Sequence, residues 1–231
     1  MPLYKKGELV MQIDAILFDM DGILIDTEII SKNAFITLTN QYGFKYIDNS
    51  YEHILGTTTE KSREICLKNY GETFPYEKIM YTVYDWVFEA VKENRLPLKK
   101  GVYECLDILK SKYKLALATS TARSAVEIYQ QHIPKLYPYF DVIVCGDEII
   151  NSKPAPDIYL EACKKLEVSP KNCIGIEDSK NGLISLRNAG IKTVMIPDLL
   201  PFHSSFKEHV DFCIEDLTKL PKLLTEIENN N

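Results

Sequence analysis

The sequence predicts an α/β protein: an open, parallel, Rossmann-like sheet with helices on both faces, and an α-helical domain inserted after the first strand. From about residue 97 onward, short apolar runs typical of strands buried on both faces alternate with amphipathic helical segments. An earlier apolar run of the same kind, at 15–18, is followed by a long stretch whose apolar residues recur at helical spacing. We therefore predict a Rossmann-like core made of residues 1–26 and 97–231, and a helical domain made of residues 27–96.

The composition indicates a globular domain of ordinary polarity. Hydrophobic residues make up 45% of the 231 residues and charged residues 26%, enough to bury a full core. The formal net charge of −6 offers no basic surface for nucleic acid or for an acidic membrane. No apolar run reaches membrane-spanning length, and residues 1–10 contain no apolar signal segment. The six cysteines show no paired metal-ligand spacing, so we expect buried free thiols in a cytoplasmic protein, while the oligomeric state has no sequence signal.

The predicted helical domain opens at Asp26-Thr27-Glu28, where acidic side chains suit the positive end of a helix dipole. Apolar residues at 30, 34, 35 and 38 then share one helical face, and Gly43 ends the helix. A second helical segment passes through residues 65–67. In a third, apolar residues at 79, 83, 86, 87 and 90 have helical spacing, which predicts that Trp86 lies in the core.

The predicted core continues with alternating helices and strands. The strands are expected at 114–119, 141–145, 172–176, 193–196 and 212–214, and the helices at 102–109, 157–165 and 183–189. Parallel sheets of this type bind ligands at the carboxyl ends of their strands. Polar residues at the ends of the predicted strands, and in the loops beyond them, are therefore the candidate site residues.

Two acidic residues, Asp19 and Asp21, directly follow the first strand. Positions two apart in a strand point the same way, so both carboxylates are expected at one edge of the sheet, and Gly22 permits a sharp turn there. Two converging acids require a cation or a shared proton between them. The alternative is a solvated acidic turn.

Three later strand ends carry groups that chemistry at Asp19 would need. The hydroxyls and backbone N–H groups of Thr119 and Ser120 can hold phosphate oxygens without adding charge, although a plain turn is the alternative. A proline-stiffened loop begins at Lys153, whose ammonium could neutralise a phosphate. The adjacent carboxylates of Glu177 and Asp178 point to a hard cation, with a helix cap as the alternative.

These four segments, in this order, resemble the four motifs of the haloacid dehalogenase superfamily, in particular the branch of β-phosphoglucomutase and the small-metabolite phosphatases. They read Asp-Met-Asp-Gly at 19–22, Ala-Thr-Ser at 118–120, Lys-Pro-Ala-Pro-Asp at 153–157 and Gly-Ile-Glu-Asp-Ser at 175–179. The resemblance implies phosphoryl transfer through an aspartyl-phosphate on Asp19, with Asp21 as general acid and base.

The resemblance also implies a ligand set. Magnesium (Mg²⁺) would be held by Asp19, by the carbonyl oxygen of Asp21, and by Asp178 with Glu177, the last directly or through water. The phosphate would be held by Thr119, Ser120 and Lys153.

The resemblance further implies a mobile helical cap, with Gly56, Thr57 and Thr59 in a substrate-contacting loop. A histidine and an arginine that β-phosphoglucomutase carries in its cap fall at Ser31 and Thr59, and Arg63 stands one helical turn further on. Neither the histidine nor the arginine is present at these positions. Their absence favours a Mg²⁺-dependent phosphatase of a small phosphorylated metabolite, a sugar phosphate or similar, over a mutase. Dehalogenase chemistry, which uses neither magnesium nor the second acid, and a non-catalytic phosphate-binding module are less expected, because all the motif groups are present.

Overall fold

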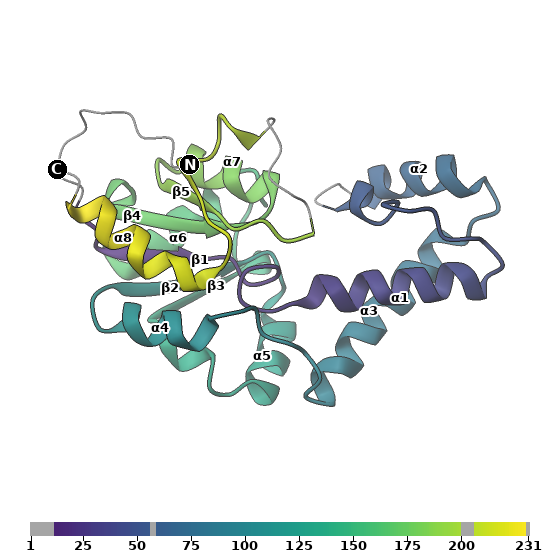
Figure 1. The fold of residues 1–231 in the computed structure, drawn as a ribbon, viewed down its shortest axis with the longest axis horizontal. Helices are drawn as coiled ribbons and strands as arrows, with labels where there is room; N and C mark the ends of the chain where they lie inside the picture. The colour runs from purple at the N-terminus through teal and green to yellow at the C-terminus, as the bar shows by residue number, and fades with distance from the viewer. Residues whose placement is uncertain (1–11, 56–58, 200–205, 230–231) are drawn as a thin grey trace. The chain divides into compact units, whose positions relative to one another are not determined.

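The computed structural model describes residues 12–55, 59–199 and 206–229 (Figure 1). The chain divides into two compact units, one within Met1–Ile25 and Leu98–Asn231 and the other Asp26–Pro97. We call them the core unit and the helical unit. No helix among the described residues is both long enough and apolar enough to cross a lipid bilayer.

The core unit contains a six-stranded sheet in which every neighbouring pair is parallel. Its strands are β1 (Ala15–Phe18), β2 (Lys114–Thr119), β3 (Val142–Cys145), β4 (Cys173–Glu177), β5 (Lys192–Met195) and β6 (Phe212–Cys213). They lie in the order β3-β2-β1-β4-β5-β6, so the first strand of the chain lies between β2 and β4. The predicted open, parallel, Rossmann-like sheet is confirmed.

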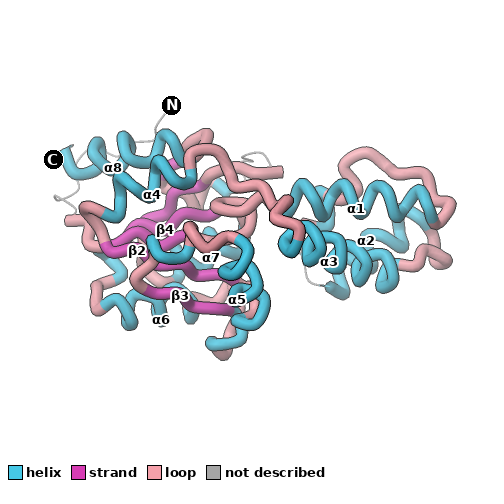
Figure 2. The backbone as a smooth tube through the Cα atoms, turned by 90° about the horizontal axis from the view of Figure 1, so that it is seen from below, coloured by secondary structure: helices cyan, strands magenta, loops and turns pink. Residues whose placement is uncertain are grey.

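Helices cover both faces of this sheet. They are α4 (Val102–Lys110), α5 (Arg123–His132), α6 (Asp157–Leu166), α7 (Lys180–Asn188) and α8 (Leu220–Asn229). Figure 2 shows α4 and α8 side by side on one face and α6 on the other, where α7 contacts it. Because side chains alternate along a strand, Ala15 and Leu17 pack with Ala116 and Ala118 toward α6 and α7. Neither α5 nor α8 is among the predicted elements.

Short 3₁₀ helices complete the described secondary structure. They are η1 (Glu52–Ile54), η2 (Tyr137–Tyr139), η3 (Gly146–Glu148), η4 (Pro170–Asn172) and η6 (Leu217–Lys219). All six cysteines are free thiols, and all except Cys213 are buried, as their positions in apolar runs predict.

The helical unit is built from α1 (Thr27–Gln41), α2 (Thr59–Tyr70) and α3 (Tyr76–Lys92). Its core is aromatic: the buried Phe35 ring contacts the rings of Tyr46, Tyr51, Tyr70 and Phe74 at centroid distances of 5.4–6.5 Å. The unit corresponds to the segment predicted at 27–96, and its role as a cap stays a prediction.

The burial of Trp86 was predicted wrongly, since this residue is 39% exposed. The buried residues of α3 include Ile79, Val83, Val87 and Ala90, which form one stripe along the helix. Successive residues of a helix point about 100° apart. Val87 belongs to the buried stripe, so the preceding residue, Trp86, points to one side of it and is partly exposed.

Candidate active site at the carboxyl ends of β1, β2 and β4

The register of the sheet determines which residues meet at its carboxyl edge. Phe18 is level with Leu117 of β2 and with Ile176 of β4. The next residue, Asp19, is therefore level with Ala118 and Glu177. The Asp19 backbone N–H donates to the Ile176 carbonyl oxygen at 3.1 Å, which extends the pairing one residue beyond β1. Asp19 thus lies where the order of the strands reverses, the usual ligand position in such sheets.

The Lys153 ammonium joins these strand ends. Its Nζ donates to Asp19 Oδ1 at 2.6 Å, to Glu177 Oε1 at 2.7 Å and to the Ala118 carbonyl oxygen at 3.2 Å. The side chain is only 6% exposed, and its Nζ lies 4.9 Å from the centroid of the Tyr159 ring. Its three protons have three oxygen acceptors, so the position of the ammonium is closely defined.

Glu177 is fully buried and accepts hydrogen bonds at both carboxylate oxygens. Oε1 accepts from Lys153 Nζ and, at 2.8 Å, from the Tyr159 hydroxyl. Oε2 accepts from the backbone N–H groups of Asp178 and Ser179 and from the Ser179 hydroxyl, at 3.0–3.1 Å. The Ser179 hydroxyl also accepts from Gly182 N and caps α7, so the helix-cap role considered for this segment belongs to Ser179.

Asp19, Lys153 and Glu177 shift one another's pKa values. Burial raises the pKa of the Asp19 carboxyl to about 7; the Lys153 ammonium opposes this and the Glu177 carboxylate adds to it. Burial alone would lower the pKa of Lys153, but the two carboxylates hold it well above its usual value. Burial would likewise raise the pKa of Glu177, and the Lys153 ammonium together with the other donors holds it below its usual value. Lys153 and Glu177 therefore form a buried ion pair beside Asp19.

Three carboxylates at this edge have the chemistry and spacing of a metal site. Asp19, Glu177 and Asp178 each offer one oxygen, and these oxygens all lie within 4.8 Å of one another. Gly22 makes room for one of them, because a Cβ at Gly22 would lie 2.4 Å from Asp178 Oδ2. Hard carboxylate oxygens are the ligands that Mg²⁺ prefers. The residues present therefore fit a magnesium ion.

The second acid and the hydroxyl segment lie on the β2 side. The Thr121 hydroxyl donates to Asp21 Oδ2 at 2.8 Å, and the Thr121 backbone N–H donates to Thr119 Oγ1 at 3.1 Å. Thr119 is buried, whereas Ser120 is exposed. The structure thus brings the predicted residues of all four motifs to the carboxyl ends of β1, β2 and β4.

Two residues at the site were not assigned a role by the sequence analysis, Thr121 and Tyr159. Thr121 stands two positions after Thr119 in the same hydroxyl segment, and Tyr159 lies in the first turn of α6, six positions after Lys153. Thr121 is indicated in the sequence by the hydroxyl segment that it ends, whereas Tyr159 stands between Ile158 and Leu160 and has no such signal. Of the predicted cap residues, Thr59 is the exposed first residue of α2, and Gly56 and Thr57 lie outside the described residues.

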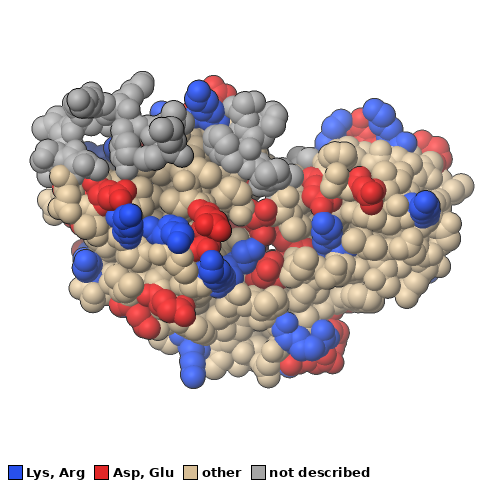
Figure 3. Space-filling view, viewed as in Figure 1, with Lys and Arg blue, Asp and Glu red and all other residues tan. Residues whose placement is uncertain are grey.

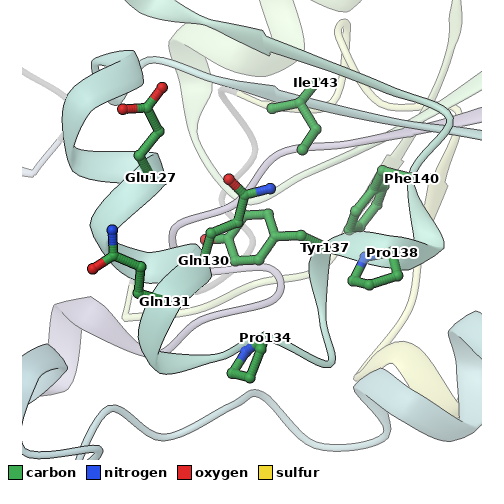
Figure 4. A pocket seen from close by; sticks show the side chains of 8 residues that line it. All are labelled: Glu127, Gln130, Gln131, Pro134, Tyr137, Pro138, Phe140 and Ile143. Atoms are coloured by element: carbon green, nitrogen blue, oxygen red, sulfur yellow. The ribbon is translucent and has the colours of Figure 1, made fainter.

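A separate cavity of about 630 Å³ lies against α5 and η2 in the core unit (Figure 4). Its lining residues are Glu127, Gln130, Gln131, Pro134, Tyr137, Pro138, Phe140 and Ile143. Tyr137 donates from its hydroxyl to Met20 Sδ at 3.7 Å, and the Phe140 ring meets the Phe18 ring edge-on at 6.1 Å. Two of its lining residues therefore contact the residues on either side of Asp19, and no predicted site residue among those described lines the cavity.

Charged side chains are mixed on the surface. On the face shown in Figure 3, the described lysine and arginine side chains are interspersed with aspartate and glutamate side chains. Many of the described cations are paired with acids, among them Lys32 with Glu52 and Lys110 with Asp141. This distribution agrees with the absence of a basic signature in the composition.

Comparison with known proteins agrees with the motifs. A family profile described as "Haloacid dehalogenase-like hydrolase" matches residues 16–196. A "Phosphorylated carbohydrates phosphatase" of Thermotoga maritima is 37% identical over 187 residues, which cover 78% of this chain and 83% of that protein.

Solved structures show the same fold. A mutant of CbbY from Rhodobacter sphaeroides, in complex with xylulose-(1,5)bisphosphate, is 28% identical, with a TM-score of 0.68 over 90% of this chain and 96% of that one. A β-phosphoglucomutase from Clostridium difficile, at 22% identity and a TM-score of 0.69, shares the fold over 94% of this chain and 98% of that one. The chain therefore belongs to the haloacid dehalogenase-like hydrolases, and the enzyme class predicted from its four motifs, a phosphoric monoester hydrolase, is confirmed.

Proposed function

We propose that this protein is a Mg²⁺-dependent phosphatase that hydrolyses a small phosphorylated metabolite, a sugar phosphate or similar, through an aspartyl-phosphate on Asp19. The observation that carries the proposal is the Lys153 ammonium bound to both Asp19 Oδ1 and Glu177 Oε1 at the carboxyl edge of the sheet. A carboxylate nucleophile and a phosphate repel each other because both are negative, and a buried cation beside the carboxylate offsets this repulsion. The relatives named for phosphorylated carbohydrates and for a bound sugar bisphosphate support the substrate class.

In the proposed reaction, a carboxylate oxygen of Asp19 bonds to phosphorus while the bond from phosphorus to the leaving oxygen breaks. Asp21 gives its proton to that departing oxygen, and then, as a carboxylate, takes a proton from the water that hydrolyses the aspartyl-phosphate. Thr119 Oγ1 accepts from the Thr121 N–H, so its own proton is directed elsewhere and can be donated to a phosphate oxygen. Lys153 offsets the negative charge that accumulates between Asp19 and the phosphate.

Asp19, the carbonyl oxygen of Asp21 and Asp178 would hold the magnesium ion. When bound, the ion supplies positive charge that offsets the repulsion between a carboxylate and a phosphate. Glu177 already accepts five hydrogen bonds at its two oxygens. We propose that Glu177 holds Lys153 and the turn at Ser179 in place, and that it is not a direct metal ligand.

We further propose that the helical unit selects substrates as a cap, with Gly56, Thr57 and Thr59 in contact with the substrate. The pairing of Arg63 favours a phosphatase over a mutase, because a mutase must also hold a second phosphate. Arg63, the nearest substitute for the mutase arginine, donates from Nε to Glu77 Oε1 at 2.6 Å within its own unit. The Glu77 carboxylate offsets the charge of Arg63 and would compete with a phosphate for its N–H groups.

The test is release of inorganic phosphate from a panel of phosphorylated sugars, nucleotides and phosphoglycolate, with Mg²⁺ and with EDTA. We expect Mg²⁺-dependent release from at least one sugar phosphate, and Asp19→Asn should lower turnover by about 10³-fold or more. Wild-type turnover in Asp19→Asn would reject the covalent scheme. Isomerised sugar phosphate in place of free phosphate would identify a mutase.

A further inference from the structure

We propose that Thr121 is a positioning residue for the proposed general acid and base: its hydroxyl fixes the orientation of the Asp21 carboxylate, and its backbone N–H fixes that of the Thr119 hydroxyl. This inference rests on the proposed function. Thr121 makes two hydrogen bonds at the site. Its hydroxyl donates to Asp21 Oδ2 at 2.8 Å, and its backbone N–H donates to Thr119 Oγ1 at 3.1 Å. Thr121 therefore connects a group that moves protons with a group that would hold the phosphate.

The backbone around Thr121 is held firmly enough to serve this purpose. The Gly146 backbone N–H, just beyond β3, donates to the Thr121 carbonyl oxygen at 3.1 Å. The backbone of Ser120 passes so close to Gly146 that a Cβ there would lie 2.2 Å from the Ser120 carbonyl oxygen. Further along, the Arg123 N–H donates to Asp147 Oδ1 at 2.9 Å. The turn after β2 is thus supported by the turn after β3, and Thr121 sits between them.

The carboxylate that Thr121 contacts has buried neighbours. The Tyr137 hydroxyl donates to the sulfur of Met20, the residue before Asp21, at 3.7 Å. Burial, and after it the charge of Asp21, raise the pKa values of Tyr129 and Tyr137. Both tyrosines are almost fully buried, and Asp21 itself is half-buried. A donated hydroxyl hydrogen bond restricts rotation of a carboxylate about its Cβ–Cγ bond, and general acid catalysis depends on that orientation.

The expected consequence depends on the leaving group. A sugar or alkyl alkoxide requires protonation as it leaves, whereas p-nitrophenolate does not, so an effect exerted through Asp21 falls mainly on alkyl phosphates. The ratio kcat/KM reports the steps through departure of the leaving group, before the aspartyl-phosphate is hydrolysed. We expect Thr121→Val to lower kcat/KM about 10- to 100-fold for an alkyl phosphate such as glycerol phosphate, and less than about threefold for p-nitrophenyl phosphate. Thr121→Ser, which keeps the hydroxyl, should restore most of the loss.

The experiment measures both substrates, with Mg²⁺, for the full-length wild type and for Asp21→Asn, Thr121→Val and Thr121→Ser. Thr225→Val is the matched control, because the exposed Thr225 hydroxyl bonds only within α8, to the Pro221 carbonyl oxygen. Thermal unfolding of each variant verifies that it is folded, and Thr121→Ala replaces Thr121→Val if the latter is not.

The outcomes separate the two proposals. The proposed function fails if the wild type releases no phosphate, or if Asp21→Asn keeps the wild-type kcat/KM for the alkyl phosphate. The positioning role of Thr121 is overturned, with the proposed function intact, by equal losses on the two substrates, by no loss at all, or by a Thr121→Ser variant as impaired as Thr121→Val.

Discussion

Replacing Glu177 by glutamine is the most direct test of how the site is held together. The substitution keeps the size of the side chain, removes its charge and exchanges one acceptor oxygen for an NH₂ donor. In the protein, Oε1 accepts from Lys153 and Tyr159, and Oε2 accepts from Ser179 and two backbone N–H groups. A carboxamide has one acceptor oxygen, so one of these two groups of donors must face an NH₂ group.

The less costly orientation turns the NH₂ group toward Lys153 and Tyr159. The Tyr159 hydroxyl can rotate to accept a proton, whereas the Lys153 ammonium can only donate. At least one charge-assisted hydrogen bond is then lost, which costs about 1.5–3 kcal/mol. Breaking a buried ion pair by removing one partner costs about 3–5 kcal/mol in all. We therefore expect the free energy of unfolding of the core unit to fall by about 3 kcal/mol or more.

The assay is equilibrium urea unfolding followed by far-UV circular dichroism. Trp86, the only tryptophan of the sequence, lies in the helical unit, so its fluorescence reports that unit and serves as an internal control. Calorimetric titration with Mg²⁺ supplies the second measurement, with Asp178→Asn for comparison. We expect Asp178→Asn to weaken Mg²⁺ binding more than Glu177→Gln does.

One pattern of results would refute the reasoning. If Glu177→Gln changed stability by less than about 1 kcal/mol, and weakened Mg²⁺ binding as much as Asp178→Asn, Glu177 would be a metal ligand. The inference from its five occupied hydrogen bonds would then be wrong.

Two further substitutions test neighbouring contacts. Tyr159→Phe removes the hydroxyl that donates to Glu177 Oε1 but keeps the ring beside the Lys153 ammonium. We expect the free energy of unfolding in urea to fall by about 1–2 kcal/mol, and an unchanged value would mean that this hydrogen bond contributes nothing. Gly22→Ala places a Cβ 2.4 Å from Asp178 Oδ2 at a φ of +81°, so Mg²⁺ affinity in calorimetry and turnover should both fall. Gly190→Ala is the matched control, because Gly190 has a similar φ of +74° with open space around it. It should cost about 1–2 kcal/mol of stability and leave Mg²⁺ affinity unchanged; equal affinities in the two variants would contradict the role assigned to Gly22.

Local sequence patterns determined the strands of the core unit and the residues of the candidate site. The strand predicted at 114–119 is present with those bounds, and the strands predicted at 141–145 and 172–176 differ by one residue at their ends. The motif residues at and beyond the strand ends predicted the family and the edge of the sheet at which they lie. The apolar periodicity predicted the burial of Trp86 wrongly, because this residue lies at the edge of the apolar face of its helix. It also gave no prediction of α5 or α8.

The tertiary structure decided how these residues act on one another. Strand order and register place Asp19 level with Glu177, and they bring Lys153 to Asp19 across 134 positions of chain. The bonds that Glu177 accepts from Lys153 and Tyr159 have no local signature, and neither has the contact of Thr121 with Asp21. The physical reason is that periodicity records which face of an element is buried, whereas partners are chosen by hydrogen bonding and packing between segments far apart in the chain. The sequence by itself therefore determined which groups are present at the sheet edge, and only the folded chain decided which atoms they bind.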